Sequence, residues 1–181
     1  MPRVSEISDS KPMQSAPSSE RVHIAIFGRC NAGKSTLVNR LTGQDVAIVS
    51  PVAGTTTDPV QKAIEINGLG AAILIDTPGL DDNTLLGAER VARSAKVLDK
   101  TDIAIILFTE AGGENELRLM EECRIREIPT LIALAHIDRL ENHEAIKEEL
   151  ARVTNRDVVA ISALTGEGIE ELTKAIVAIR P

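Results

Sequence analysis

Aromatic residues are almost absent from this chain of 181 residues. They make up 1% of the sequence, as two phenylalanines, and there is neither tryptophan nor tyrosine. A folded core must therefore be aliphatic, and the 43% of hydrophobic residues are enough to build one. Proteins that hold single-stranded nucleic acid commonly stack bases on aromatic side chains. The composition therefore argues against direct binding of nucleic acid.

Positive charge and cysteine are also scarce. Lys and Arg together number 20 against 27 Asp and Glu, which gives a formal net charge of −7 without any block of basic residues. Because nucleic-acid binding depends on cationic surface, the charge supports the same exclusion. The two cysteines, Cys30 and Cys123, are too few and too far apart for a disulfide framework or a thiolate metal site.

Long hydrophobic runs are missing as well. No stretch approaches the roughly 18 apolar residues of a membrane span, and the first 20 residues lack the apolar core of a secretory signal. Those residues are rich in Ser and Pro, so we expect residues 1–20 to form a flexible tail. Residues 21–181 have the length of one domain. The sequence predicts a cytoplasmic protein without membrane contacts.

From residue 21 onward, strand-like and helix-like patterns alternate. Strands are predicted at Val22–Phe27, Val60–Ile66, Ala71–Ile75, Asp102–Phe108, Thr130–Ala135 and Val158–Ile161, and helices at Lys34–Thr42, Leu86–Asp99, Glu114–Arg126, Asn142–Val153 and Gly168–Ile179. The short turn at residues 67–70 predicts an antiparallel hairpin, whereas helical crossovers elsewhere predict parallel neighbours. We therefore expect an α/β fold with a six-stranded, mostly parallel sheet, one antiparallel edge strand and helices on both faces.

The segment Gly28-Arg29-Cys30-Asn31-Ala32-Gly33-Lys34-Ser35 lies between the first predicted strand and helix. It matches G-x-x-x-x-G-K-S, the loop of P-loop NTPases, in which backbone N–H groups converge on phosphates. Lys34 would neutralise the β- and γ-phosphates, and the Ser35 hydroxyl would ligate Mg²⁺. The motif predicts that the following residues bind nucleotide: Gly28, Asn31, Ala32, Gly33, Lys34, Ser35 and Thr36.

Two further segments carry groups that Mg²⁺ and a γ-phosphate require. Asp76-Thr77-Pro78-Gly79 follows the third strand; alone it would be an ordinary turn, but beside a phosphate loop Asp76 can hold Mg²⁺ and the Gly79 N–H can meet the γ-phosphate. Gly54-Thr55-Thr56-Thr57-Asp58-Pro59 is either a polar linker or, as we favour, a switch loop in which a Thr closes over Mg²⁺. Lys34 and Gly79 are therefore predicted catalytic groups.

The ends of the fifth and sixth strands predict guanine recognition. The fifth leads into Ala135-His136-Ile137-Asp138, where Asp138 can accept two hydrogen bonds from guanine that adenine cannot donate. The sixth leads into Ser162-Ala163, where the Ala163 N–H can reach guanine O6. Taken alone, an Asp at this position is more often a helix cap than a base-recognition residue. After a phosphate loop, these residues predict a preference for GTP or GDP.

In this order the segments resemble the small-GTPase class of P-loop NTPases across residues 21–181. Asn31 and Gly54-Thr55-Thr56 are similar to Era-like and tRNA-modifying GTPases. That resemblance implies that Asn31 helps to hold K⁺ beside the phosphates and that Thr56 is a Mg²⁺ ligand and catalytic group. The strings at residues 55–60, 76–82 and 86–91 resemble HydF, the GTPase family of [FeFe]-hydrogenase maturation.

The sequence departs from these families at three places. Ala135-His136 replaces the Asn-Lys of the usual base-recognition motif, so we expect looser guanine binding. Leu80 stands where many GTPases carry a water-orienting Gln, so we expect slow hydrolysis that relies on Lys34, Mg²⁺ and K⁺. Arg29 is expected to be a solvated loop residue. Further HydF-like domains are not present, so we expect an isolated GTPase domain or a short relative.

Three functions are compatible with the sequence. The first is a GTP-hydrolysing switch, stimulated by K⁺, that acts in [FeFe]-hydrogenase maturation and meets maturation proteins or the hydrogenase through domains outside this chain. The second is an Era-like or tRNA-modification GTPase that acts on RNA, which the net charge and the lack of aromatics disfavour. The third is a nucleotide-binding module with negligible turnover.

Overall fold

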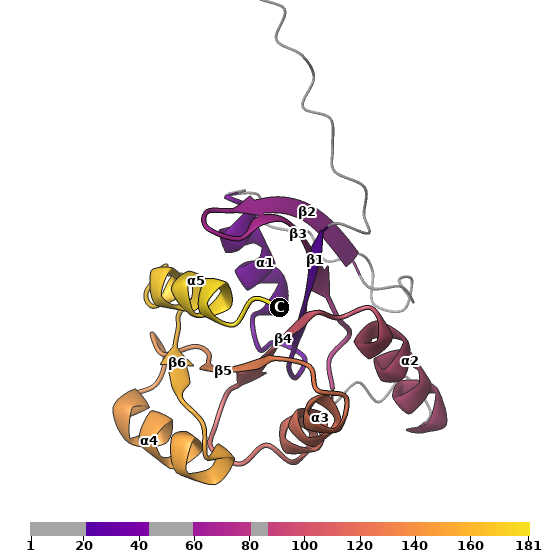
Figure 1. Ribbon diagram of the computed structural model, residues 1–181. Coiled ribbons are helices and arrows are strands. Elements are labelled where there is room, and N and C mark those ends of the chain that lie inside the picture. The colour runs from indigo at the N-terminus through magenta and orange to yellow at the C-terminus, as the bar shows by residue number, and fades with distance from the viewer. Residues whose placement is uncertain (1–20, 44–59, 81–86) are drawn as a thin grey trace, which may run out of the picture.

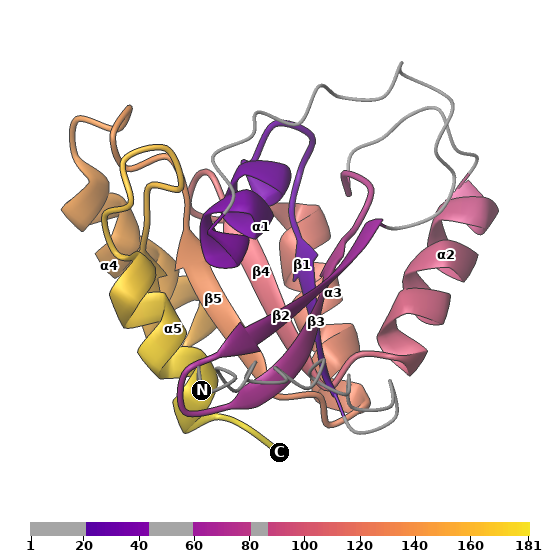
Figure 2. The ribbon, with the colours of Figure 1, turned by 90° about the horizontal axis from the view of Figure 1, so that it is seen from above.

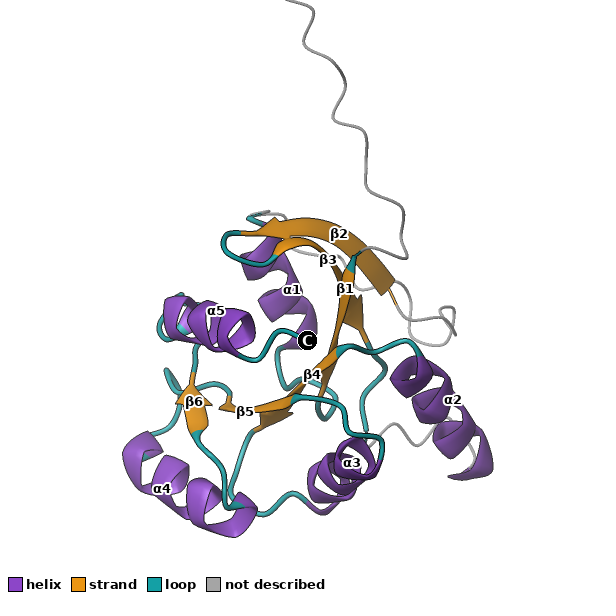
Figure 3. Ribbon diagram, viewed as in Figure 1, coloured by secondary structure: helices purple, strands orange, loops and turns teal. Residues whose placement is uncertain are grey.

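The computed structural model describes residues 21–43, 60–80 and 87–181. The predicted tail, the predicted switch loop with Thr56, and Asp81 to Leu86 lie outside the described residues. Five helices alternate with six strands in the described part of the chain (Figures 1 and 3). In chain order these elements are β1 (Val22–Phe27), α1 (Lys34–Thr42), β2 (Val60–Ile66), β3 (Gly70–Asp76), α2 (Gly87–Asp99), β4 (Ile103–Phe108), α3 (Glu114–Ile125), β5 (Thr130–Leu134), α4 (His143–Thr154), β6 (Val158–Ala160) and α5 (Ile169–Ala178).

The six strands form one sheet in the order β2-β3-β1-β4-β5-β6. Only the β2–β3 pair is antiparallel, with Val60 opposite Asp76 and Ile66 opposite Gly70. The other neighbours are parallel, and β1 lies in the middle between β3 and β4. The predicted fold class is confirmed, including the antiparallel edge strand.

Helices cover both faces of the sheet (Figure 1). On one face α1 and α5 bury Leu37, Leu172 and Ile176 against the sheet. On the other face α2, α3 and α4 bury an equally aliphatic set that includes Leu98 and Leu150. Because β4 is covered on both faces, all six of its residues are buried, which explains its unbroken apolar sequence.

The bounds of β1, α1 and β2 are as predicted, and those of the other elements differ by one residue at one or both ends. The difference that matters is at β3, which extends from Gly70 to Asp76 and therefore includes Asp76 as its last residue. Asp76 is paired with Ile26 of β1 on one side and with Val60 of β2 on the other. The sheet therefore positions this carboxylate, which the sequence pattern placed one residue beyond the end of the strand.

The segments with predicted chemistry follow the carboxyl ends of β1, β3, β5 and β6. The loops that leave β1, β5 and β6 lie along the same edge of the molecule (Figure 2). Ligands of open α/β sheets bind beyond this edge. Among the described helices, none combines the length and the hydropathy needed to cross a bilayer.

We expect Gly168, which precedes α5, to contribute more to stability than Gly43, which follows α1. It has a φ of 77°, and a Cβ there would overlap the carbonyl oxygen of Ala160. Gly43 has a similar φ of 70°, but a Cβ there would meet open space. Gly43→Ala should therefore cost about 1–2 kcal/mol for backbone strain alone, and Gly168→Ala about 1–3 kcal/mol more. Urea unfolding of both variants measures the difference; equal losses would contradict the packing argument.

Candidate functional site

The loop of residues 28–33, hereafter the phosphate loop, turns back on itself between β1 and α1. Asn31 and Gly33 have positive φ angles of 64° and 89°, which allow the tight turn into the helix. The Ala32 N–H donates to the Arg29 carbonyl at 3.1 Å. A Cβ at Gly28 would lie 3.2 Å from the backbone oxygen of Leu107, so β4 closes the loop from behind.

Lys34 reaches back along this loop. Its side chain is buried, with 7% exposed, and Nζ donates to the carbonyl oxygens of Gly28 at 3.0 Å and Arg29 at 2.6 Å. A buried ammonium group needs such partners. The positive charge is thus concentrated within the loop, where phosphate oxygens would lie.

Ser35 and Asp76 meet beside Lys34. The Ser35 hydroxyl donates to Asp76 Oδ2 at 2.5 Å. Burial raises the pKa of Asp76 above its ordinary value, although the hydrogen bond from Ser35 and the positive charge of Lys34 act in the opposite direction. Asp76 Oδ1 is buried without a hydrogen-bond partner among the described residues.

This pair fits a bound Mg²⁺. Mg²⁺ prefers hard oxygen ligands, commonly one or two from the protein together with phosphate and water. The Ser35 hydroxyl and the Asp76 carboxylate, whose Oδ1 is unpaired, supply such oxygens at one place. The third predicted ligand, Thr56, lies outside the described residues.

The segment that follows β3 lies directly against the phosphate loop. Leu80 N–H donates to the Gly28 carbonyl at 3.0 Å, and the Thr77 hydroxyl donates to the Ile26 carbonyl at 2.7 Å. A Cβ at Gly79 would lie 2.6 Å from the backbone nitrogen of Cys30. Position 79 therefore requires glycine, because any side chain would separate the two segments.

The candidate base-binding residues form a second group. Ser162 is fully buried, and its hydroxyl donates to Asp138 Oδ1 at 2.8 Å while it accepts the Thr165 N–H at 3.1 Å. The orientation of the Asp138 carboxylate is thus set by the loop that follows β6. The structure brings together Asp138 and Ser162, as the sequence predicts.

Arg40, near the end of α1, holds the same loop in place. Its Nε donates to the Ala163 carbonyl at 2.9 Å, and its terminal nitrogen donates to the Leu164 carbonyl at 2.5 Å. With both carbonyls engaged by α1, the loop that carries the Ala163 N–H is anchored to the helix that starts at the phosphate loop. The sequence analysis missed this residue, since nothing in the pattern of α1 marks a contact 123 positions away.

His136 connects the two groups. It has a positive φ of 60°, and its Nε2 lies 2.6 Å from the Asn31 carbonyl oxygen. Because a carbonyl only accepts, Nε2 must carry the proton in this contact. A Cβ at Gly33 would lie 3.3 Å from the imidazole ring, so His136 also covers the turn into α1. His136 therefore joins the base-binding segment to the phosphate loop, although Ala135 beside it is buried and contributes no polar group.

The side chain of Thr36 is exposed to solvent, whereas that of Arg29 is held by two ion pairs. Thr36 is exposed at the start of α1. Arg29 was expected to be solvated, but its side chain forms ion pairs with Glu110 and Glu116, both at 3.0 Å. This corrects the expectation, and the reason is that the segment after β4 brings two carboxylates to the phosphate loop.

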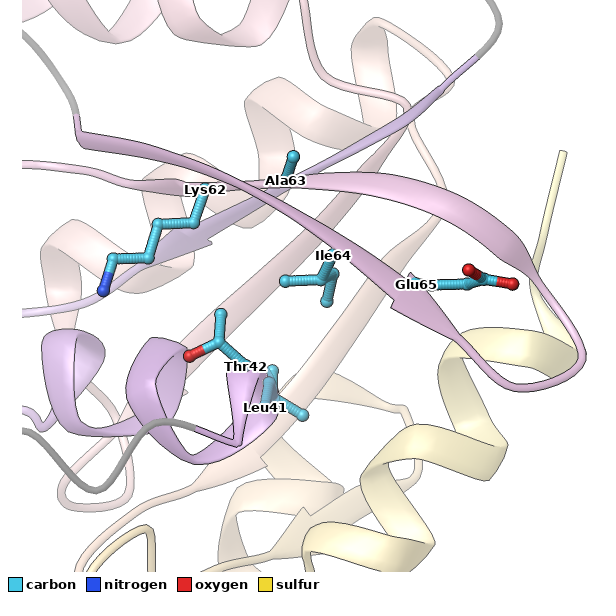
Figure 4. Close-up of a pocket in the computed structure, with 6 residues that line it drawn as sticks. All are labelled: Leu41, Thr42, Lys62, Ala63, Ile64 and Glu65. Carbon is cyan, nitrogen blue, oxygen red and sulfur yellow. The ribbon is translucent and has the colours of Figure 1, made fainter. Parts of the chain in front are cut away.

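A hollow of about 390 Å³ lies at the other end of α1. Its lining comes from the end of the helix and from the edge strand β2, namely Leu41, Thr42, Lys62, Ala63, Ile64 and Glu65 (Figure 4). The helix spans nine residues, or about 13 Å at 1.5 Å per residue. The hollow is therefore separate from the nucleotide site.

The fold and the assembled loops define the class of protein. A phosphate loop between β1 and α1, a magnesium-type oxygen pair at the end of β3, and an Asp–Ser pair after β5 and β6 are the parts of a GTPase domain. Residues 23–159, more than half of the chain, match the family model described as 50S ribosome-binding GTPase. The chain belongs to this GTPase family.

Individual relatives agree with the family. The chain is 36% identical over 159 residues to the tRNA modification GTPase MnmE of Thermotoga petrophila, a match that covers 84% of this chain and 34% of MnmE. It is 33% identical over 178 residues to MnmE of Zymomonas mobilis, where it covers 96% of this chain and 37% of MnmE. The chain thus spans about a third of the length of the curated relatives it matches.

Solved structures show the same fold. Aquifex aeolicus Era bound to GDP.AlF4⁻ superposes with a TM-score of 0.72 at 28% identity, over 88% of this chain and 56% of Era. The cytosolic domain of the T. maritima FeoB iron transporter in its GMPPNP form gives a TM-score of 0.63 at 29% identity, over 87% of this chain and 63% of that domain.

We expect Asp76→Asn to uncouple Mg²⁺ from nucleotide binding without unfolding the protein. Burial disfavours the ionised form of the Asp76 carboxylate. Its removal should therefore leave the free energy of unfolding in EDTA unchanged or slightly higher. Affinity for a GTP analogue in MgCl₂ should fall about tenfold or more, because a metal ligand is lost, whereas affinity in EDTA should stay the same. Calorimetry in both buffers checks this, with the exposed Asp157→Asn as control. A variant that keeps its full response to Mg²⁺ would exclude Asp76 as a ligand.

Proposed function

We propose that this domain binds GTP and hydrolyses it slowly, and that it acts as a nucleotide-dependent switch. The observation that carries the proposal is the assembly, on one sheet edge, of Lys34, the Ser35–Asp76 pair and the Asp138–Ser162 pair. Membership of a GTPase family supports it. The sequence also allows a nucleotide-binding module with negligible turnover. The rate measurement below distinguishes that function from GTP hydrolysis.

Each group has a distinct role in this proposal. The backbone N–H groups of the phosphate loop and the Lys34 ammonium bind the β- and γ-phosphates and stabilise the charge that develops there. Ser35, Asp76 and the predicted Thr56 would hold Mg²⁺, which neutralises phosphate charge when it is bound. The Gly79 N–H would meet the γ-phosphate, because Gly79 lies against the phosphate loop.

The base would be read by three groups. Asp138 accepts hydrogen bonds from guanine, Ser162 orients Asp138, and the Ala163 N–H meets guanine O6. An analogue that lacks the guanine donors leaves a carboxylate unpaired, which is the main source of discrimination. Ala135 removes one contact of the usual motif, while His136 keeps a link to the phosphate loop through Asn31.

K⁺ is proposed as an additional cofactor. Asn31 is exposed on the phosphate loop, where an amide oxygen suits a monovalent cation beside the phosphates. Leu80 cannot polarise water, so a cation is a reasonable source of the missing charge stabilisation.

The relatives favour the RNA-linked role over hydrogenase maturation. The reported matches are tRNA modification GTPases, Era and FeoB, and one Era structure is a complex with nucleotides 1506–1542 of 16S ribosomal RNA. We propose a role of the Era or tRNA-modification type. The charge of −7 still argues that the contact with RNA, if this domain takes part in it, is made largely by other parts of a longer protein.

Hydrogenase maturation is kept as a second candidate on one observation. The string Thr55-Thr56-Thr57-Asp58-Pro59-Val60 resembles HydF more than the other families. The length of the full gene, and whether its remainder carries Cys and His ligands for an iron–sulfur cluster, discriminates between the two roles.

GTP hydrolysis should be faster in KCl than in NaCl. If Asn31 helps to hold the cation, the difference should be about tenfold or more, and Asn31→Ala should abolish it while leaving the rate in NaCl unchanged. Release of phosphate under single-turnover conditions measures both rates. Equal rates of the unaltered domain in the two salts would contradict the potassium proposal.

Binding should favour GTP over ATP by at least about a hundredfold. Asp138→Ala should remove most of this preference by weakening GTP binding, and it should leave the weak affinity for ATP unchanged because that affinity resides in the phosphates. Calorimetry with both nucleotides tests the expectation, with Asp157→Ala as the control. An unaltered domain that binds ATP as tightly as GTP would refute guanine recognition.

A further inference from the structure

The side chain of Arg29 turns away from the interior of the phosphate loop and towards the segment that follows β4. Its Nε donates to Glu116 Oε1 at 3.0 Å, and one terminal nitrogen lies 3.0 Å from Glu110 Oε1. The exposed fraction of the Arg29 side chain is 35%, against 59% for Glu110 and 1% for Glu116. The buried carboxylate of Glu116 is therefore the stronger of the two restraints.

Glu116 is placed by the fold so that it faces the phosphate loop. It is the third residue of α3, where the positive end of the helix dipole favours a carboxylate. A Cβ at Gly113 would collide with the Glu116 carboxylate, so the glycine before α3 makes room for it. Glu116 Oε2 is buried without a hydrogen-bond partner in the described ranges. A charge buried in this way depends on Arg29 for compensation.

The backbone carbonyl of Arg29 also takes part in the site. Its carbonyl oxygen accepts both the Lys34 ammonium at 2.6 Å and the Ala32 N–H at 3.1 Å. The side chain and the carbonyl of one residue therefore connect α3 to the lysine of the nucleotide site. We expect that release of the Arg29 side chain would loosen the position of this carbonyl, which is one of the two that hold the Lys34 ammonium.

We infer that Glu116 is a positioning residue for nucleotide binding, which acts by fixing Arg29 and, through it, the phosphate loop and Lys34. This inference rests on the nucleotide site proposed above. It connects α3 directly to the phosphate loop through two residues that are 87 positions apart in the sequence. Since the contact is to the phosphate loop, it concerns affinity for GDP and GTP alike and leaves the choice of base unchanged.

The test compares nucleotide affinities of full-chain variants. Glu116→Gln should weaken GDP and GTP binding by a similar factor of about 5–50, with the GTP-to-ATP preference unchanged. Arg29→Met should cause a comparable loss. The double variant should be no weaker than the weaker single variant, because both changes break the same contact. Glu114→Gln on the same helix, whose side chain is 78% exposed and pairs with Arg118, should bind as the unaltered domain does.

The outcomes separate the inference from the proposed function. Glu116→Gln affinities within twofold of the unaltered domain, or losses that multiply in the double variant, would overturn the role of Glu116 alone. An unaltered domain that binds no guanine nucleotide would overturn both. If Arg29→Met does not fold, because it leaves the buried Glu116 carboxylate without its cation, Glu116→Gln and the double variant decide, since neither buries an unpaired charge. Weak binding by these folded proteins supports the inference, and full affinity excludes it.

Discussion

The carbonyl groups of the phosphate loop are the part on which the rest of the site depends. Gly28 O accepts from Lys34 and Leu80, Arg29 O accepts from Lys34 and Ala32, and Asn31 O lies against His136 Nε2. The engaged carbonyls fix the course of the loop, and a loop of fixed shape can present backbone N–H groups to a phosphate, which is how backbone concavities bind anions. The loop is thus held in shape by contacts that come from α1, the segment after β3 and the segment after β5.

In the proposed switch, these contacts would allow one small loop to report on the bound nucleotide. The segment after β3 is bonded to Gly28, the segment after β5 to Asn31, and the first turn of α3 to Arg29. Each of the three segments would sense a change in the loop. A switch needs such differential contacts between its bound states and its effectors, and here they converge on one turn of backbone.

Two carboxylates at the site, those of Asp76 and Glu116, are buried or partly buried. Asp76 is held at the end of β3 against a desolvation penalty that raises its pKa, and Ser35 compensates only part of that penalty. Glu116 is still more buried and is compensated by Arg29. Buried carboxylates that are only partly compensated are a cost to folding, and groups of this kind cluster at functional sites, where the charge is used.

The local sequence pattern was sufficient to predict the helices, the strands and the residues within each motif. The alternation of apolar runs predicted the sheet, and the order Gly28 to Ser35, Asp76 to Gly79 and Asp138 to Ala163 predicted a nucleotide site at its carboxyl edge. These features depend on spacing within a few residues, which a sequence displays directly. The boundary of β3 was less certain, since Asp76 belongs to the strand through pairing with β1 and β2.

The long-range contacts could be known only from the tertiary structure. Three contacts join segments that are about 90 to 120 positions apart: Arg40 with the loop after β6, His136 with Asn31, and Glu116 with Arg29. No local spacing in the sequence indicates any of these contacts. The amino-acid order decided which chemical groups are present and on which edge of the sheet they lie. The packing of α1 and α3 against that edge decided which of those groups touch, because a contact between distant segments depends on the position of whole elements in space.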